Sequence, residues 1–362
     1  LMFITSNKWM RAGYGENTRK FLAENSNPLQ LVDFAGQKIF DAATVDVNVL
    51  LFSKQKNRGE TEACVVKEKC TDNLSDYIVQ HRTSSNFNHS DSWVILSAIE
   101  QRIKEKIERV GTPLKDWDIQ INYGIKTGFN EAFIISGEKR KELIEKDPKS
   151  EEIIRPILRG RDIKRYSYNF ADLWLINTYN GVKEKGIKPI DIDDYPAVKE
   201  HLDQYFPQLK KRQDKGDTPY NLRNCAYLED FYRPKIVFQE MVQKSAFSYD
   251  EDINFFCLDT GRIIVGKDLK YLLAFLNSKL FFYSVKKYYG GGGLGESGIR
   301  MKHTFFEKFH CIGNIDKTIL IDMTSKIIKS NNDEERAKLI KEVDNIIFDL
   351  YVAFAQRAVV GS

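Results

Sequence analysis

Apolar positions near the start of the chain predict the order strand, helix, strand, strand. The strands are expected at 1–4, 29–34 and 45–52, with the first of them buried, and the helix is expected at 15–24. The run at 45–52 is continuous and β-branched, which is typical of a strand buried on both faces. These elements make up half of an α/β sheet, and an isolated half-sheet exposes an unpaired edge. We therefore expect the sheet to continue upstream of Leu1.

The next part of the chain predicts a polar linker followed by a helix. Residues 53–89 are polar and predict a linker with one short strand pair, near 63–66 and 77–79. After this linker, Asp91 or Ser92 is a candidate cap for a helix. Its apolar face is formed by Ile95, Ile99, Ile103 and Ile107. A helix with one apolar face between two domains is interpreted as a packed connector.

Beyond this connector the pattern mixes short strands with helices. Apolar runs bounded by turn residues predict strands at 173–176, 235–239, 246–249, 255–258 and 263–265. Helical spacing predicts a helix after 191, one over 269–283 with a break at Asn277 and Ser278, and a tail of two helices over 317–356 with a break near 331–333. This region is therefore expected to hold a small mixed sheet of the α+β type with a helical tail.

A loop with two glycines follows the connector. Gly124 and Gly128 flank Lys126 and Thr127, and Asn130 follows closely. Glycine lets the backbone come close to another surface. A lysine, a hydroxyl and an amide on such a loop can reach phosphates or base edges of a nucleic acid. The alternative is an ordinary β-turn.

A basic segment follows at 155–166. It carries five cations opposed by Asp162, namely Arg155, Arg159, Arg161, Lys164 and Arg165. Arginine's planar fork suits phosphate and guanine, so the segment is a candidate for binding a polyanion. The alternative is a solvated basic helix end, and on residue chemistry alone the two interpretations are balanced.

Two further stretches combine cations with other features. The first has an aromatic side chain among its cations and consists of Lys210, Lys211, Arg212, Tyr220 and Arg223. The second is the glycine run Gly290–Gly293 with Arg300 and Lys302 beyond it. Because this run follows a helix and not a strand, it does not fit a dinucleotide-binding fingerprint. We expect a loop that settles against DNA, with a plain surface loop as the alternative.

Composition narrows the class of protein without naming it. The 362 residues are 42% hydrophobic and 29% charged, as in an ordinary globular chain. The net charge of +4 permits a local nucleic-acid patch but does not require one. No apolar run is long enough to span a membrane. The five cysteines form no C-x-x-C pair and the five histidines have no metal-ligand spacing, so we expect no metal site and, as the default for scattered thiols, a cytoplasmic location.

The glycine loop and the basic segment also carry a resemblance. The stretches GIKTGFNEAFII and RPILRGRDIKRY resemble the opening of the TaqI-like specificity domain, the target-recognition part of type IIG restriction–modification enzymes and related adenine methyltransferases. Three further stretches match in the expected order: YFPQLKKRQDKGDTPYNLRNCAYLEDFYRPKIVFQE, YLLAFLNSKLFFYSVKKYYGGGGLGESGIRMK and VDNIIFDLY. The resemblance covers most of the chain from Trp117 onward and implies binding to double-stranded DNA.

The beginning of the chain resembles the last third of an amino-methyltransferase catalytic domain, through FITSNKWMRAGYGENTRKFL and LVDFAGQKIFDAATVDVNVLLF. In that family the cofactor-binding glycine motif and the catalytic Asn-Pro-Pro-Tyr lie earlier, and neither occurs here. The resemblance therefore implies S-adenosylmethionine as cofactor of the parent protein, with none bound by this chain, and Mg²⁺ only if an upstream nuclease domain exists. Phe40 matches the aromatic residue that stacks on a flipped-out adenine. On residue type alone it is a core phenylalanine.

The expected organisation has four regions. These are the C-terminal part of a methyltransferase domain at 1–58, a linker and connector helix at 59–111, a DNA target-recognition domain at 112–315, and C-terminal helices packed on it at 316–362. The expected function is sequence recognition for a site-specific adenine-N6 DNA methyltransferase, a parent that also cleaves DNA if it carries a nuclease. The alternatives are a non-catalytic specificity subunit and a protein-interaction scaffold of a phage-defence system. The recognition sequence and the oligomeric state stay open.

Overall fold

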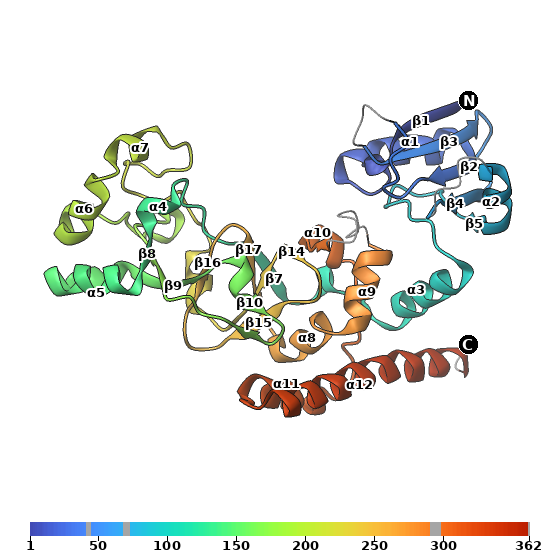
Figure 1. Cartoon of the computed structure of the whole chain (residues 1–362). Coiled ribbons are helices and arrows are strands. Elements are labelled where there is room, and N and C mark those ends of the chain that lie inside the picture. The colour runs from blue at the N-terminus through green and yellow to red at the C-terminus, as the bar shows by residue number, and fades with distance from the viewer. Residues whose placement is uncertain (41–44, 68–72, 290–297, 361–362) are drawn as a thin grey trace. The chain divides into compact units, whose positions relative to one another are not determined.

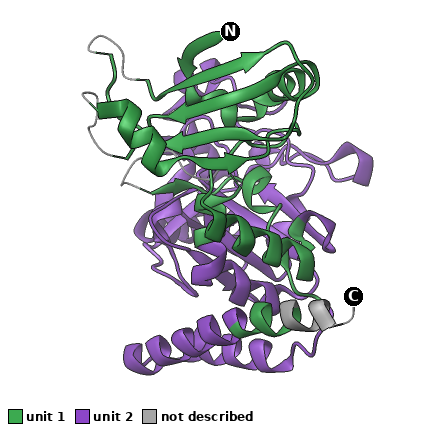
Figure 2. Cartoon of the chain, turned by 90° about the vertical axis from the view of Figure 1, so that its right-hand side faces the viewer, with its two compact units in different colours: residues 1–114, 283–313, 349–362 green, residues 115–282, 314–348 purple. Residues whose placement is uncertain are grey.

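The structure of the chain is a computed structural model that describes residues 1–40, 45–67, 73–289 and 298–360, with side chains through Phe354 (Figure 1). It contains two compact units (Figure 2). The first unit comprises 1–114, 283–313 and 349–362, and the second unit comprises 115–282 and 314–348. The glycine run Gly290–Gly293, expected to form a DNA-facing loop, lies outside the described residues.

The first unit is built on one five-stranded sheet. The strands of this sheet are β1 (Met2–Ser6), β2 (Asn27–Asp33), β3 (Val47–Ser53), β4 (Thr61–Val65) and β5 (Thr83–Ser85). The unit also contains three short strands outside the sheet, β6 (Thr112–Pro113), β18 (Ile299–Arg300) and β19 (His310–Cys311). Its helices are α1 (Glu16–Asn25), α2 (Leu74–His81), α3 (Ala98–Val110) and α10 (His303–Phe306). The sheet order is β1-β3-β2-β4-β5, in which β2 is antiparallel to β3 and parallel to β4.

The first strand lies where the sequence predicts it, but the prediction that it is buried is wrong. β1 is an edge strand that pairs only with β3 among the described strands, and its side chains are exposed, with Phe3 at 51% and Ile4 at 48%. The predicted helix at 15–24 and strand at 29–34 are confirmed as α1 and β2. β3 lies between β1 and β2, and its two faces contribute to different cores, through Leu50 on one face and Val47 on the other, which accounts for its continuous apolar run.

The predicted linker belongs to the sheet. The strand expected near 63–66 is β4, but its partner in sequence at 77–79 is part of α2, and β5 completes the sheet instead. Leu74, Tyr77 and Ile78 pack against the sheet core at helical spacing. This spacing of three and four residues is typical of one face of a helix, so the prediction of a strand at 77–79 is wrong.

The connector helix begins later than predicted. Neither Asp91 nor Ser92 caps it: α3 starts at Ala98 with Ser97 as its cap, and Glu100 completes a capping box. The preceding residues are extended because Trp93 is fully buried and its amide donates to the carbonyl of Met10 at 2.7 Å. The burial of one indole in the sheet core therefore outweighs helical periodicity over this stretch.

The second unit contains two four-stranded sheets. Its strands are β7 (Ile119–Tyr123), β8 (Ile134–Ser136), β9 (Ile154–Leu158), β10 (Ile163–Lys164), β11 (Ser167–Tyr168), β12 (Leu173–Ile176), β13 (Lys235–Gln239), β14 (Met241–Val242), β15 (Phe247–Asp250), β16 (Phe256–Cys257) and β17 (Gly261–Gly266). The sheet orders are β16-β9-β12-β8 and β15-β13-β17-β7. One core of aliphatic and aromatic side chains is shared by both sheets, with the rings of Phe231 and Phe256 stacked 4.5 Å apart.

The helices of the second unit are α4 (Asn130–Phe133), α5 (Gly137–Lys146), α6 (Pro196–Asp203), α7 (Phe206–Lys211), α8 (Leu269–Leu276), α11 (Thr318–Lys329) and most of α12 (Asp333–Val360). α9 (Lys279–Lys287) contains the boundary between the units. The predicted break at Asn277 and the two-helix tail are confirmed, as is the mixed α/β class. None of the described helices combines the length and the apolar character that crossing a membrane requires.

Candidate nucleic-acid interface

The glycine loop at 124–130 is shaped by close backbone contacts. A side chain on Gly124 would lie 2.0 Å from the carbonyl oxygen of Leu258, so only glycine fits there. Gly128 has a φ of +72°, a left-handed conformation that favours glycine. Thr127 is buried, and its hydroxyl donates to Oδ1 of Asn130 at 2.6 Å while accepting from the amide of Phe129 at 3.2 Å. Thr127 therefore shapes the turn, and Lys126 is the exposed cation of this loop.

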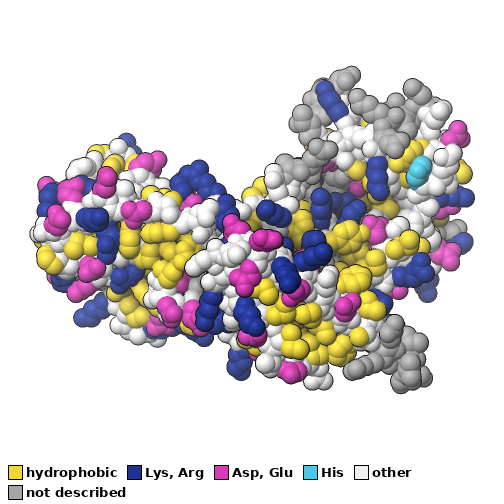
Figure 3. All heavy atoms as spheres, turned by 60° about the horizontal axis from the view of Figure 1, so that its bottom comes forward, with side chains coloured by type: hydrophobic (Ala, Val, Ile, Leu, Met, Phe, Trp, Pro, Cys, Tyr) yellow, Lys and Arg dark blue, Asp and Glu magenta, His cyan; other side chains and the backbone are white. Residues whose placement is uncertain are grey.

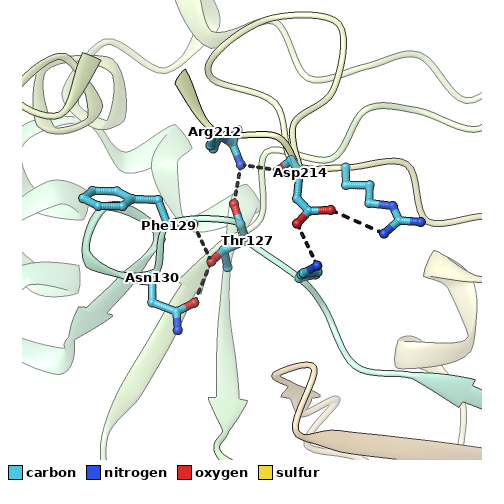
Figure 4. Close-up of polar contacts among 7 residues, drawn as sticks. Thr127, Phe129, Asn130, Arg212 and Asp214 are labelled. Atoms are coloured by element: carbon cyan, nitrogen blue, oxygen red, sulfur yellow. Dashed lines mark hydrogen bonds and ion pairs between the residues drawn. The ribbon is translucent and has the colours of Figure 1, made fainter. Parts of the chain in front are cut away.

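A buried arginine fastens this loop to the segment after α7 (Figure 4). The Arg212 guanidinium donates to the carbonyl oxygens of Thr127, Asp214 (3.1 Å), Pro219 (3.0 Å) and Asn221. Burial lowers its pKa to about 10, against the opposing effect of Asp214, so it stays charged at neutral pH. Arg212, expected to contact DNA, is 7% exposed with both terminal nitrogens occupied. Its position favours a structural role.

Asp214 links two exposed cations across these segments. Its carboxylate lies 2.8 Å from Nζ of Lys126 and 3.4 Å from Nη1 of Arg223. The hydrogen bond from Lys126, together with the charge of Arg223, lowers the pKa of Asp214. The side chains of Lys126 and Arg223 are 49% and 62% exposed. We call Lys126, Asp214 and Arg223 the charge bridge.

The five cations of the basic segment occupy different environments. Arg155 donates to three backbone carbonyls and to the hydroxyl of Tyr232. Arg159 forms a two-pronged ion pair with the buried Asp162, at 2.8 and 2.9 Å. Arg165 pairs with Asp344 of α12 at 3.2 Å. These three arginines hold the fold together.

The other two cations of the segment point outward. Lys164 is exposed and donates to the carbonyl of Arg161 at 2.7 Å. Arg161 is exposed, and its side chain has no hydrogen bond or ion pair with any described residue. Arg161 is therefore the member of this segment with its whole hydrogen-bonding fork available to a ligand.

The residues of the second basic stretch also occupy different environments. Lys210 and Lys211 are exposed at the end of α7. Tyr220 donates to Asp203 at 2.5 Å, and burial followed by this hydrogen bond raises its pKa to about 12. In the first unit, Arg300 is exposed and Lys302 half-buried. On the face shown in Figure 3, Lys and Arg side chains lie among Asp and Glu side chains and do not form one continuous basic surface.

Phe40 does not occupy a core position. Its side chain is 42% exposed, so the interpretation as a core phenylalanine at a strand end is wrong. The residues that follow it, 41–44, lie outside the described part of the chain. An exposed aromatic ring is accessible for stacking on a planar group.

The structure also reveals a cavity that the sequence analysis missed. It measures about 410 Å³ beside the charge bridge and is lined by Lys126, Arg223, Tyr123, Asn224, Cys225, Tyr227 and neighbouring residues. The exposed ring of Tyr123 is backed by the buried guanidinium of Arg262, 3.8 Å from the ring centroid. Burial raises the pKa of Cys225 to about 11 and that of Tyr227 to about 12, so both are neutral at pH 7. In the sequence, the signal for this cavity is Tyr123, the aromatic residue directly before Gly124.

The side chains described in this region do not favour a metal site. Among the residues that the structure describes, no group of three or more His, Cys, Asp or Glu side chains could hold a metal ion. The available groups are exposed cations, an aromatic ring and amides, at the ends of loops that a buried arginine holds in place. Such a set can bind phosphates and read base edges.

Comparisons with known proteins define the class. Residues 155–293 match the TaqI-like C-terminal specificity domain, and residues 1–40 match the Eco57I restriction-modification methylase family. The chain is thus related to restriction–modification methylases with a TaqI-like specificity domain, in agreement with the sequence resemblance.

Particular relatives agree with this class. The chain is 21% identical over 297 residues to the type II methyltransferase M.BstVI of Geobacillus stearothermophilus, with 75% of this chain and 49% of that protein covered. It is 26% identical over 240 residues to the type II restriction enzyme and methyltransferase RM.Eco57I of Escherichia coli, with 60% of this chain and 24% of that protein covered. The chain thus spans about half or less of the length of these relatives.

A solved structure shares the fold. The type IIL restriction-modification enzyme MmeI, solved in complex with DNA, aligns with a TM-score of 0.61 at 13% identity. The alignment covers 98% of this chain and 47% of that one. At this identity the similarity supports the arrangement of elements in space and not the role of single residues.

Proposed function

We propose that this chain carries the target-recognition region of a site-specific adenine-N6 DNA methyltransferase of a restriction–modification system, acting on double-stranded DNA. Supporting it are the specificity-domain match at 155–293 and the methyltransferases among the relatives. The proposed organisation keeps the four regions 1–58, 59–111, 112–315 and 316–362. Cleavage of DNA with Mg²⁺ belongs to this proposal only for a parent that carries a nuclease.

The observation that carries the proposal is the charge bridge. Asp214 holds Lys126 and Arg223 at the ends of two segments that are otherwise 97 residues apart in sequence, and both cations stay largely exposed. A DNA phosphate competes with the carboxylate for these cations, since an exposed ion pair is weak. Arg161, Lys210 and Lys211 supply further exposed charge. The same loops carry Tyr123 and Asn224, which can meet base edges.

The methyl donor in this proposal is S-adenosylmethionine. Its sulfonium is a cation, whereas a cavity of about 540 Å³ in the first unit has five lysine and arginine side chains in its lining and one carboxylate, Glu100. This cavity does not fit the donor, so we assign no step of methyl transfer to the described residues. Phe40 is proposed to stack on the extruded adenine, because its ring is exposed beside the strands of the first unit.

The alternative functions have less support. A non-catalytic specificity subunit does not account for the match of residues 1–40 to a methylase family. A protein-interaction scaffold does not require exposed cations on loops that a buried arginine holds together. Both alternatives remain outcomes of the experiment below.

The test begins with selection of duplexes from a random pool, followed by affinity measurements on the selected and a scrambled sequence across a salt series. Lys126→Ala with Arg223→Ala is expected to weaken binding and lower the salt slope by about two units. A matched control is Lys267→Ala with Lys270→Ala, two lysines of the same unit that also pair with carboxylates. Absence of any enriched sequence, or equal behaviour of test and control variants, counts against the proposal.

A further inference from the structure

A second cation-rich site lies in the first unit, apart from the loops described above. The cavity measures about 540 Å³. It is lined by the end of β4, by α2 and β5, by the stretch before α3, and by the last turn of α9. Its charged lining consists of Arg11, Lys67, Arg82, Lys286, Lys287 and Glu100. Two of these cations pair with carboxylates outside the lining, Asp33 and Glu62, and the remaining excess of positive charge favours an anion.

Three of the five cations already have partners. Arg11 pairs with Asp33 at 3.2 Å, and Arg82 pairs with Glu62 at 2.6 Å. Lys287 lies 3.6 Å from the carboxylate of Glu100. These pairs hold the walls of the cavity in place, and they leave the ligand-binding charge to the remaining two.

Lys67 and Lys286 are the two remaining cations. Both are exposed, and neither has a side-chain hydrogen bond or ion pair with any residue that the structure describes. They come from different parts of the chain, the segment after β4 and the last turn of α9, yet line the same cavity. Because both lysines line one cavity without an ion-pair partner among the described residues, an anion in this cavity is attracted by both charges.

The start of α3 adds to the same potential. Ser97 and Ala98 line the cavity, so the N-terminus of this 13-residue helix, which carries partial positive charge, lies at its wall. The capping box formed by Ser97 and Glu100 already satisfies some of the backbone N–H groups at this end of the helix. The helix therefore supports the two lysines and does not define the site by itself.

We propose that this cavity binds a phosphate group of the DNA backbone, with Lys67 and Lys286 as direct contacts. The inference rests on the proposed function and extends it to the first unit. Lysine is a point charge on a flexible stem, which suits a phosphodiester whose position shifts with DNA sequence. The site therefore contributes affinity for DNA of any sequence, while discrimination between sequences comes from the second unit.

The test compares Lys67→Ala/Lys286→Ala with Lys20→Ala/Lys54→Ala, which removes two exposed lysines of the same unit that lie outside the cavity. Affinities are measured for selected and scrambled duplexes across a salt series. The cavity variant is expected to bind both duplexes more weakly, with unchanged discrimination and a salt slope smaller by about two units. The matched control retains the affinity and slope of the unaltered chain.

A second readout identifies the source of the phosphate. Lysine acetylation followed by mass spectrometry is expected to show Lys67 and Lys286 protected by duplex DNA and not by ATP or inorganic triphosphate at equal phosphate concentration. Protection by the free phosphates alone, or a cavity variant that matches its control, overturns the proposal. If the unaltered chain binds no duplex at all, the proposed function fails together with this inference. If the chain binds duplex but the cavity variant matches its control, only this inference fails.

Discussion

The guanidinium of Arg212 donates to the carbonyl oxygen of Thr127, although the two residues are 85 positions apart in sequence. The contact joins the glycine loop to the segment after α7 (Figure 4). Arg212 also donates to three other carbonyl oxygens, and these four hydrogen bonds together hold the segments that carry Lys126 and Arg223, the two cations of the charge bridge. A cation that looks like a ligand contact in sequence therefore holds the ligand contacts in place.

Replacing this arginine tests its structural role. Arg212→Ala leaves buried carbonyl oxygens without donors, and each such oxygen costs about 1–3 kcal/mol. Because Lys presents no planar fork, Arg212→Lys is expected to recover little of the loss. Hydrogen exchange of the amides at 125–130 measures the effect, with Lys211→Ala as the exposed control. Equal protection of these amides in the Arg212→Ala and control variants contradicts the assignment.

The Asp214 carboxyl is expected to titrate below its ordinary range. Its folded-state pKa is lowered, chiefly by the hydrogen bond from Lys126, so the charge bridge contributes stability above the unfolded pKa of about 3.9. This contribution is lost as the pH falls through the folded pKa. Carbon-13 NMR titration of the carboxyl measures the shift, and Lys126→Ala is expected to move the pKa upward. An unchanged pKa in that variant excludes Lys126 as the main cause.

Removing the same carboxylate is expected to strengthen binding to DNA. Asp214→Asn frees Lys126 and Arg223 and deletes one negative charge beside them. Affinity for scrambled duplexes rises, and the salt dependence steepens because more counterions are released. A matched change is Asp118→Asn, which frees Lys267 in the same unit. The prediction is wrong if Asp118→Asn raises the affinity as much as Asp214→Asn.

Arg159 and Arg161 are expected to respond differently to the same substitution. Arg161→Ala leaves folding intact and weakens DNA binding, because this side chain has no partner among the described residues. If Arg161 reads a base, the loss is about 1–3 kcal/mol with relaxed discrimination at one position, whereas a phosphate contact weakens all sequences alike. Arg159→Ala instead breaks the pair with buried Asp162 and lowers stability. Thermal unfolding beside duplex binding separates the two, and identical profiles refute this division.

A buried ion pair stabilises the second unit. Nζ of Lys235 lies 2.6 Å from Asp250 with both side chains 1% exposed, and Asp250 also accepts from the amides of Ile253 and Phe255. Asp250→Ala leaves Lys235 as a buried charge without its counterion, which costs about 3–5 kcal/mol. Urea unfolding followed by hydrogen exchange in β13 measures the loss. Lys267→Ala, at an exposed pair, serves as the control.

Five of the eleven strands described in the second unit, and its helices α6, α8, α11 and α12, were predictable from local pattern. Runs such as 173–176 and 235–239 alternate or cluster apolar residues over short lengths, and each buries its face in one local sheet. The start of α3 was not predictable from periodicity. The isoleucine spacing of four extends to Ile95, upstream of Ser97, but the burial of Trp93 in the first unit's core keeps that stretch out of the helix. Local pattern fails where a distant contact is worth more than a turn of helix.

The same division applies to the candidate interface. Residue types and order alone indicated a TaqI-like specificity region and located its cations, because charge and motif are properties of the chain itself. Only the tertiary structure separated the buried Arg212 and the paired Arg159 and Arg165 from the exposed Arg161, and brought Lys126 to Asp214. The physical reason is that the role of a cation depends on its solvent exposure and on partners from distant segments, and folding alone determines both.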